Sequence, residues 1–256
     1  MAAQDGECMI QAIIFDLDGT LVQTERLKAM SYARAIQELC DGAIDEADIL
    51  EAFKDFVGLS RREVALGLVQ RFTLEEASRQ RMAEFGVSAP WQAFVQVRLR
   101  HYEAILADPQ VICDNTWPHT LALLAEARRY RCKVGLATMS VCQQVRRVLE
   151  ILNLTGAFDF IASRDDVKHG KPDPEIYRLV ASELDVPPGN CLVIEDSPSG
   201  IQSALAARMK CIAVTTPFTR AAVHTGQLLD PRWIVDDPTL LPSVVRQAFA
   251  EQEEKA

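Results

Sequence analysis

Short apolar runs alternate with amphipathic stretches along most of the chain. The first run, residues 9–15, is compact and is followed directly by acidic residues and a glycine, a pattern typical of a buried strand. Similar runs follow at 133–137, 158–161, 191–194, 211–214 and 233–235. Helical patterns lie between them at 117–131, 141–152, 173–184 and 198–209. Strands that alternate with helices of about 12 residues predict an α/β fold, a doubly wound parallel-sheet (Rossmann-like) core covered on both faces.

One long stretch interrupts this alternation. Between residues 24 and 107, apolar positions such as Met30, Ala33, Ile36 and Leu39 recur at helical spacing, and no segment reads as a strand. The stretch lies between the first strand and the rest of the sheet. The pattern therefore predicts an all-helical domain at 24–107, inserted into an α/β core made of 1–23 and 108–256, with the return linker near 107–111.

Composition and charge narrow the function classes. The chain has 256 residues, of which 48% are hydrophobic and 25% charged, as in ordinary soluble globular proteins. Its net charge of −9 and the lack of a basic stripe argue against a nucleic-acid partner. No apolar run approaches about 18 residues, and no basic, then apolar, leader opens the chain. We expect a cytoplasmic protein, a monomer or weak dimer, with no membrane partner.

The cysteines and histidines do not form a recognisable ligand pattern. Seven cysteines are scattered without a Cys-x-x-Cys pair, and the four histidines lie far apart. This spacing argues against a zinc site and gives no support to a disulfide framework.

Acidic pairs follow two of the predicted strands. Asp16 and Asp18 come directly after the first strand, and Glu195 and Asp196 follow the strand at 191–194. Residues two apart in extended chain point to the same side, so Asp16 and Asp18 can face one site. Neighbouring carboxylates repel unless a cation lies between them. A hard cation with oxygen ligands resolves this, and Mg²⁺ suits such a site.

Two further strand-end segments supply donors for an anion. Thr138, Met139 and Ser140 follow the second strand of the core and offer hydroxyl and backbone N–H groups near a helix start. Lys171 lies between two later strands and is followed by Pro172. Each feature alone has a structural explanation, such as a turn, a helix cap or a surface charge. Their coincidence at one edge of one sheet favours phosphoryl transfer through an acyl phosphate, with one carboxylate as nucleophile and another as acid/base.

Three stretches resemble the haloacid dehalogenase superfamily, and the resemblance covers nearly the whole chain. They are Phe-Asp-Leu-Asp-Gly-Thr-Leu at 15–21, Lys-Pro-Asp-Pro-Glu-Ile-Tyr at 171–177 and Ile-Glu-Asp-Ser-Pro-Ser-Gly-Ile at 194–201. The last two are similar to the β-phosphoglucomutase-like branch. Members of that branch carry a helical cap directly after the first motif, where the periodicity also predicts helices.

The resemblance implies a role for each matching residue. Asp16 would be the nucleophile and a Mg²⁺ ligand, and Asp18 the acid/base whose backbone carbonyl also binds the metal. Thr138 and Lys171 would hold the transferring phosphoryl group. Glu195 and Asp196 would complete the metal site. In the cap, the segment 57–61 resembles a substrate-specificity loop with Arg61 at its arginine position, and we expect specificity to depend on Thr24, Lys28, Gly58 and Arg61.

The chain departs from the mutase pattern at several positions. Lys28 stands where mutase-type members carry histidine, and Val141 and Cys142 stand where they carry a Lys-Asn pair that grips a second phosphate. An apolar residue and a thiol cannot anchor a phosphate dianion. Gln23 and His119 also replace the usual acidic residue and glycine. These changes affect which substrate we expect the protein to bind more than which reaction we expect it to catalyse.

Three functions therefore stay open from sequence. The first is a Mg²⁺-dependent phosphatase acting on a small phosphorylated metabolite, such as a sugar phosphate. The second is a sugar-phosphate mutase of the β-phosphoglucomutase type. The third is a non-enzymatic, receiver-like phosphoaspartate domain, although receivers lack a second aspartate two residues after the first and are too short for the insertion.

Overall fold

The computed structural model describes residues 10–56 and 61–253. The chain divides into two compact units. The core unit consists of Met1–Gln23 and Thr116–Ala256, and the helical unit of Thr24–Asn115. Met9 and Gly58, both part of the sequence predictions, lie outside the described residues.

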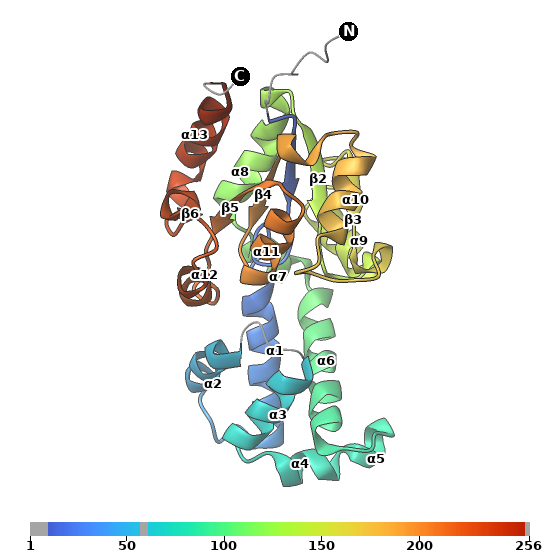
Figure 1. Cartoon of the computed structure of the whole chain (residues 1–256). Coiled ribbons are helices and arrows are strands. Elements are labelled where there is room, and N and C mark those ends of the chain that lie inside the picture. The colour runs from blue at the N-terminus through green and yellow to red at the C-terminus, as the bar shows by residue number, and fades with distance from the viewer. Residues whose placement is uncertain (1–9, 57–60, 254–256) are drawn as a thin grey trace. The chain divides into compact units, whose positions relative to one another are not determined.

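The described part of the core unit contains one parallel sheet in the order β3-β2-β1-β4-β5-β6 (Figure 1). Its strands are β1 (Ala12–Phe15), β2 (Lys133–Ala137), β3 (Phe160–Ala162), β4 (Cys191–Glu195), β5 (Lys210–Val214) and β6 (Ile234–Val235). Each predicted apolar run overlaps one of these strands, so the prediction of a doubly wound parallel sheet is confirmed. β1 lies in the centre between β2 and β4.

Helices connect the strands of the core unit. The α-helices are α8 (Pro118–Ala127), α9 (Cys142–Ile151), α10 (Glu175–Glu183), α11 (Pro198–Ala206), α12 (Arg220–Gly226) and α13 (Leu241–Glu253). Short 3₁₀ helices occur at Arg128–Tyr130, Arg164–Asp166, Pro188–Asn190, Pro231–Trp233 and Pro238–Leu240. Helices α10 and α11 pack against the sheet and against each other, as α8 and α13 also do. Prolines begin α8 and α11, where a missing N–H costs no helical hydrogen bond.

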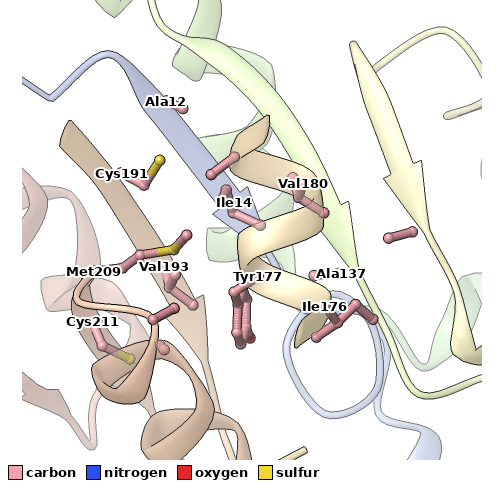
Figure 2. Close-up of a cluster of buried hydrophobic side chains, with 14 of the residues drawn as sticks. Ala12, Ile14, Ala137, Ile176, Tyr177, Val180, Cys191, Val193, Met209 and Cys211 are labelled. Carbon is pink, nitrogen blue, oxygen red and sulfur yellow. The ribbon is translucent and has the colours of Figure 1, made fainter. Parts of the chain in front are cut away.

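A buried apolar cluster fixes α10 on the sheet. Tyr177 and Val180 of α10 pack with Ile14 of β1 and Val193 of β4 (Figure 2). All four side chains are fully buried, and each such burial contributes about 1.5–3 kcal/mol. The cluster therefore holds the Tyr177 ring in one place beneath the edge where the strands end.

The helical unit contains only helices in its described part. They are α1 (Thr24–Leu39), α2 (Glu46–Phe53), the 3₁₀ helix Lys54–Phe56, α3 (Arg61–Arg71), α4 (Glu75–Gln80), α5 (Met82–Phe85), α6 (Pro90–Ala107) and α7 (Pro109–Asp114). The long helices α1 and α6 pack along each other, and α2, α3 and α4 add to this pair. Tyr32, Phe53 and Phe94 form the aromatic centre, with ring centroids 5.4 and 5.8 Å from Tyr32.

The helical unit extends beyond the return point expected from the sequence. The expected linker near 107–111 is mostly helix α7, and the unit ends at Asn115. The reason is local: the Asp108 side chain caps α7 by accepting from the Gln110 N–H, and Val111 packs on a cluster with Leu27 and Ile105. A proline after an aspartate marked a helix start here rather than a linker.

Candidate active site

The first acidic pair follows β1 at the carboxyl edge of the sheet. The Asp16 N–H donates to the Ile194 carbonyl at 3.0 Å, so the ladder with β4 continues into the site. Asp16 is 5% exposed. Burial, together with the neighbouring carboxylates of Glu195 and Asp18, raises the pKa of Asp16 to about 7 against the lowering effect of Lys171. The local structure thus creates a carboxylate that needs positive charge to stay ionised.

Lys171 supplies part of that charge. Its Nζ lies 2.7 Å from Asp16 Oδ1 and 2.7 Å from Glu195 Oε1, and it also donates to the Ala137 carbonyl at 3.0 Å. The ammonium lies 4.9 Å from the centre of the Tyr177 ring. Burial alone would lower the pKa of Lys171, but the two carboxylates raise it well above its usual range. Lys171 is therefore a permanently charged bridge between β1 and β4.

Glu195 accepts five hydrogen bonds from four residues. Its Oε1 accepts from Lys171 and from the Tyr177 hydroxyl at 3.0 Å. Its Oε2 accepts from the Asp196 N–H at 2.9 Å and from the Ser197 N–H and hydroxyl at 2.9 and 3.0 Å. Burial would raise the pKa of Glu195, but Lys171 and these hydrogen bonds lower it. Glu195 is thus an ionised anchor that fixes Lys171.

Two close approaches explain the glycines of the motifs. Gly19 has φ +91°, and a Cβ there would lie 2.2 Å from Asp196 Oδ2. A Cβ at Gly200 would lie 1.6 Å from Glu195 Oε1. Neither position has room for a side chain. The glycines let the turn after β1 and the start of α11 approach the acidic pair at 195–196.

The buried acidic residues fit a divalent cation. One ligand oxygen each of Asp16, Glu195 and Asp196 lies within 4.8 Å of the others, and all three residues are buried. Lys171 pairs with two of these carboxylates, those of Asp16 and Glu195. Hard oxygen donors with excess negative charge are what Mg²⁺ binds. Glu195 already accepts five hydrogen bonds, so a cation would compete with these donors for its oxygens.

The second aspartate forms a separate cluster with hydroxyl groups. Thr138 Oγ1 donates to Asp18 Oδ2 at 3.0 Å, and Ser140 Oγ donates to the same oxygen at 2.7 Å. The Ser140 N–H donates to Thr138 Oγ1 at 3.1 Å, which orients that hydroxyl. Residues predicted from two different strand ends therefore contact each other. The structure brings Asp18, Thr138 and Ser140 into one hydrogen-bonded group.

Met139 and the predicted residues of the helical unit have other surroundings within their own units. The Met139 side chain packs on the apolar cluster around Tyr177, which leaves only its backbone for a ligand. Thr24 is buried, and its hydroxyl has no hydrogen-bond partner among the described residues. Lys28 pairs with Glu25 at 2.7 Å. Arg61 begins α3, and the four residues before it lie outside the described part.

Sequence reasoning assigned no role to Tyr177, Ser197 or Asp165. Tyr177 and Ser197 both donate to Glu195. Asp165 Oδ2 accepts from the Cys142 N–H at 2.7 Å and so caps the start of α9 from another loop. Tyr177 and Ser197 were inside quoted motifs and could have been found there. Asp165 had no signal, because its partner is 23 residues away.

Comparison with known proteins identifies the class. The model of the haloacid dehalogenase-like hydrolase family matches residues 10–208, and the chain belongs to this family. It is 29% identical to hexitol phosphatase B of Escherichia coli over 90% of this chain and 91% of that protein. It is 28% identical to the β-phosphoglucomutase of Bacillus subtilis over 80% of this chain and 83% of that protein. The relatives therefore include both a phosphatase and a mutase.

A solved structure supports the same assignment. CbbY from Rhodobacter sphaeroides in complex with phosphate is 27% identical to this chain, with a TM-score of 0.57 over 83% of this chain and 89% of that one. The predicted membership of the β-phosphoglucomutase-like branch agrees with these relatives. In the described residues no helix combines the length and the apolar character required to cross a bilayer.

Proposed function

We propose that this protein is a Mg²⁺-dependent phosphatase that hydrolyses a small phosphorylated metabolite through an aspartyl phosphate on Asp16. The observation that carries the proposal is the buried bridge from Lys171 to Asp16 and Glu195, both at 2.7 Å. Such a bridge orients the Asp16 carboxylate and places a fixed positive charge beside the oxygens of an incoming phosphoryl group. The phosphatases among the relatives support the same reaction class.

In the first step, an Asp16 oxygen attacks phosphorus, and the bond from phosphorus to the leaving oxygen breaks. The leaving oxygen takes its proton from Asp18. Because Thr138 and Ser140 both donate to Oδ2 of Asp18, we assign this proton to Oδ1. A bound Mg²⁺ would add positive charge that keeps Asp16 ionised and neutralises the phosphoryl oxygens.

In the second step, Asp18 acts as a base. It takes a proton from water, whose oxygen attacks the phosphorus of the aspartyl phosphate. The bond between phosphorus and the Asp16 oxygen breaks, phosphate leaves, and both aspartates return to their starting states. Lys171 stays charged throughout, since its pKa is raised by both carboxylate partners.

The start of α9 favours the phosphatase over the mutase. Mutase-type members grip a second phosphate at the positions of Val141 and Cys142, and here Val141 is apolar and exposed. The Cys142 N–H is already bonded to the Asp165 carboxylate at 2.7 Å. A negative charge at this helix start repels an anion. Val141 and Cys142 therefore offer no charged side-chain donor to a second phosphate, and the Asp165 carboxylate beside them repels it.

The test is phosphate release from a panel of phosphomonoesters with Mg²⁺, run on the wild type and on Asp16→Asn. We expect turnover of at least one small substrate and a loss of about 10³-fold or more in the variant, because an amide does not attack phosphorus. Asp230→Asn, an exposed aspartate at the start of a 3₁₀ helix, is the matched control. Near-wild-type turnover by Asp16→Asn, or no release from any substrate, contradicts the proposal. Isomerised product that depends on added hexose bisphosphate identifies a mutase instead.

A further inference from the structure

Tyr177 contacts both members of the buried ion pair between Lys171 and Glu195. It lies in the first turn of α10, and its side chain is fully buried. Its hydroxyl donates to Glu195 Oε1 at 3.0 Å, and the centre of its ring lies 4.9 Å from Lys171 Nζ. The Lys171 ammonium donates to the same Oε1 at 2.7 Å. One side chain therefore bonds to the acceptor of the pair and faces the donor with an aromatic ring.

The hydroxyl completes the set of contacts on Glu195. Oε1 accepts from Lys171 and Tyr177. Oε2 accepts from the backbone N–H groups of Asp196 and Ser197 and from the Ser197 hydroxyl. A carboxylate oxygen has two lone pairs, so Lys171 and Tyr177 fill those of Oε1. Without the hydroxyl the carboxylate can turn about its contacts at Oε2, and Oε1 no longer meets Lys171 in one fixed direction.

The ring acts on the Lys171 ammonium in a different way. An ammonium has three N–H donors, and Lys171 has three acceptors. They are Asp16 Oδ1, Glu195 Oε1 and the Ala137 carbonyl, at 2.7, 2.7 and 3.0 Å. The Tyr177 ring takes none of these hydrogen bonds. Its negative face attracts the cation and limits how far Nζ can move away from the two carboxylates.

The ring itself is held by the core unit. It packs among buried apolar side chains of α10 and the sheet, which include Ile14, Val180 and Val193 (Figure 2). Close-packed interiors resist displacement of a side chain of this size. Tyr177 therefore connects the position of the Lys171 ammonium to the packing of the sheet and α10.

We propose that Tyr177 is a positioning residue, which sets the place of the Lys171 ammonium beside the Asp16 carboxylate. This inference rests on the proposed phosphatase function, in which Asp16 attacks phosphorus. Tyr177 acts through Lys171 and Glu195, because its side chain is fully buried and does not reach a substrate. Misplacement of a reacting group by about 1 Å can cost about 10²-fold in rate, so the role affects kcat more than KM.

Tyr177→Phe keeps the ring and removes the hydroxyl. On the panel substrate with the highest kcat/KM, we expect kcat to fall about tenfold and KM to stay within about twofold of the wild type. Tyr177→Leu also removes the aromatic ring and should lower kcat by about a further threefold or more. A kcat of Tyr177→Phe within about twofold of the wild type, or a change in KM alone, overturns the proposal.

Val180→Ala separates positioning from general packing. Val180 follows Tyr177 on the same helix, is fully buried in the same cluster and has an apolar side chain. We expect Val180→Ala and Tyr177→Phe to lower the free energy of unfolding to a similar extent, while kcat of Val180→Ala stays within about twofold of the wild type. Turnover is measured at a temperature at which every variant is folded. A fall in kcat for Val180→Ala as large as that for Tyr177→Phe would show that Tyr177 is only structural and overturn the proposal.

A measurement without substrate tests the same role. Proton exchange between the Lys171 ammonium and water can be followed by ¹H–¹⁵N NMR, with the signal identified by its loss in Lys171→Arg. The Tyr177 hydroxyl holds the acceptor that protects this ammonium from water. We therefore expect exchange about tenfold faster in Tyr177→Phe than in the wild type, and unchanged exchange in Val180→Ala.

The positioning role and the phosphatase function fail in different ways. If no substrate is hydrolysed, the proposed function fails, and the exchange rate alone decides whether Tyr177 positions Lys171. If substrates are hydrolysed and Tyr177→Phe matches the wild type, the phosphatase function stands and the positioning role is overturned. Ammonium exchange that Tyr177→Phe leaves unchanged overturns the role, whatever the turnover.

Discussion

Lys171 in the core unit and Arg98 in the helical unit are both buried cations that lie over tyrosine rings. The Lys171 ammonium is 4.9 Å from the Tyr177 ring centre, and the Arg98 guanidinium is 4.4 Å from that of Tyr102. Lys171 has two carboxylate partners at 2.7 Å. Arg98 has none among the described residues. The pKa of Lys171 is raised by Asp16 and Glu195, whereas burial lowers that of Arg98.

The difference lies in where the balancing charge comes from. A reacting group must be held in one geometry before the substrate arrives, which requires that its charge is matched by the protein itself. The protein itself matches the charge of Lys171 with two carboxylates, whereas the Nε of Arg98 is buried without a hydrogen-bond partner among the described residues.

The largest expected effect comes from removing the matched cation. Lys171→Met leaves Asp16 and Glu195 buried without their common partner. We expect turnover to fall about 10³-fold or more and the free energy of unfolding to fall by about 3–5 kcal/mol, as for other broken buried pairs. Added Mg²⁺ restores part of the stability if the acidic residues bind it. Turnover on the best panel substrate and denaturant unfolding with and without Mg²⁺ measure both effects.

The control for this substitution lies in the same loop. Lys168→Met removes an exposed ammonium three residues earlier, whose backbone N–H, not its side chain, bonds to Glu175. We expect less than a twofold change in turnover and at most about 0.5 kcal/mol in stability. Turnover in Lys171→Met within tenfold of the wild type would contradict the role given to the bridge.

Much of the core site can be predicted from the sequence, because the carboxyl ends of parallel strands lie at the same edge of the sheet. Once the alternation of runs gives a parallel sheet, Asp16, Thr138 and Glu195 must meet at one edge, whatever the loop details. The contacts that hold Glu195 did not follow from the sequence. The contacts that make Glu195 an anchor come from Tyr177 and Ser197, whose positions depend on how α10 and α11 pack. The spacing of apolar residues predicts these helices but not their packing.

The helical unit shows the opposite case. Its helices follow from spacing, but the end of the unit was placed at 107 instead of Asn115, since a capped turn and a linker look alike in sequence. The sequence gives no signal that sets Arg98 apart. An arginine in an amphipathic helix is ordinarily solvated, and only the three-dimensional packing of Tyr32 and Tyr102 shows that this one is buried.

A second prediction, with a smaller expected effect, concerns Glu38, a carboxylate of the helical unit that has partners within that unit. Glu38 accepts hydrogen bonds from Arg81, Arg100 and His101 at 2.7, 2.6 and 2.7 Å. Burial would raise the pKa of Glu38, but these bonds lower it to about 2. A lowered pKa means that the stabilisation is present above the ordinary value of 4.5 and is lost as the pH falls from there towards 2. Glu38→Gln should therefore cost about 1 kcal/mol at pH 7.

The pH dependence is the diagnostic part of this prediction. The difference in unfolding free energy between wild type and Glu38→Gln should shrink as the pH is lowered below about 4.5. Glu51→Gln, an exposed carboxylate paired with Lys54, provides the comparison and should show a smaller difference at pH 7. A Glu38→Gln difference that is constant between neutral and acidic pH would show that its charge is not what stabilises the unit.

The smallest expected effect is also the sharpest test of the comparison, because its sign is opposite to that of Lys171→Met. Arg98→Met replaces an unpaired buried cation by an apolar chain of similar length. Lost hydration opposes the folded state of the wild type, whereas the rings of Tyr32 and Tyr102 support it. We expect the free energy of unfolding to stay unchanged or rise by up to about 1 kcal/mol. Denaturant unfolding at pH 7 without ligand measures this, with Arg100→Met beside it. A loss of more than about 2 kcal/mol would mean that the two rings and Arg98 form a structural unit, and that the unmatched charge of Arg98 does not weaken the fold.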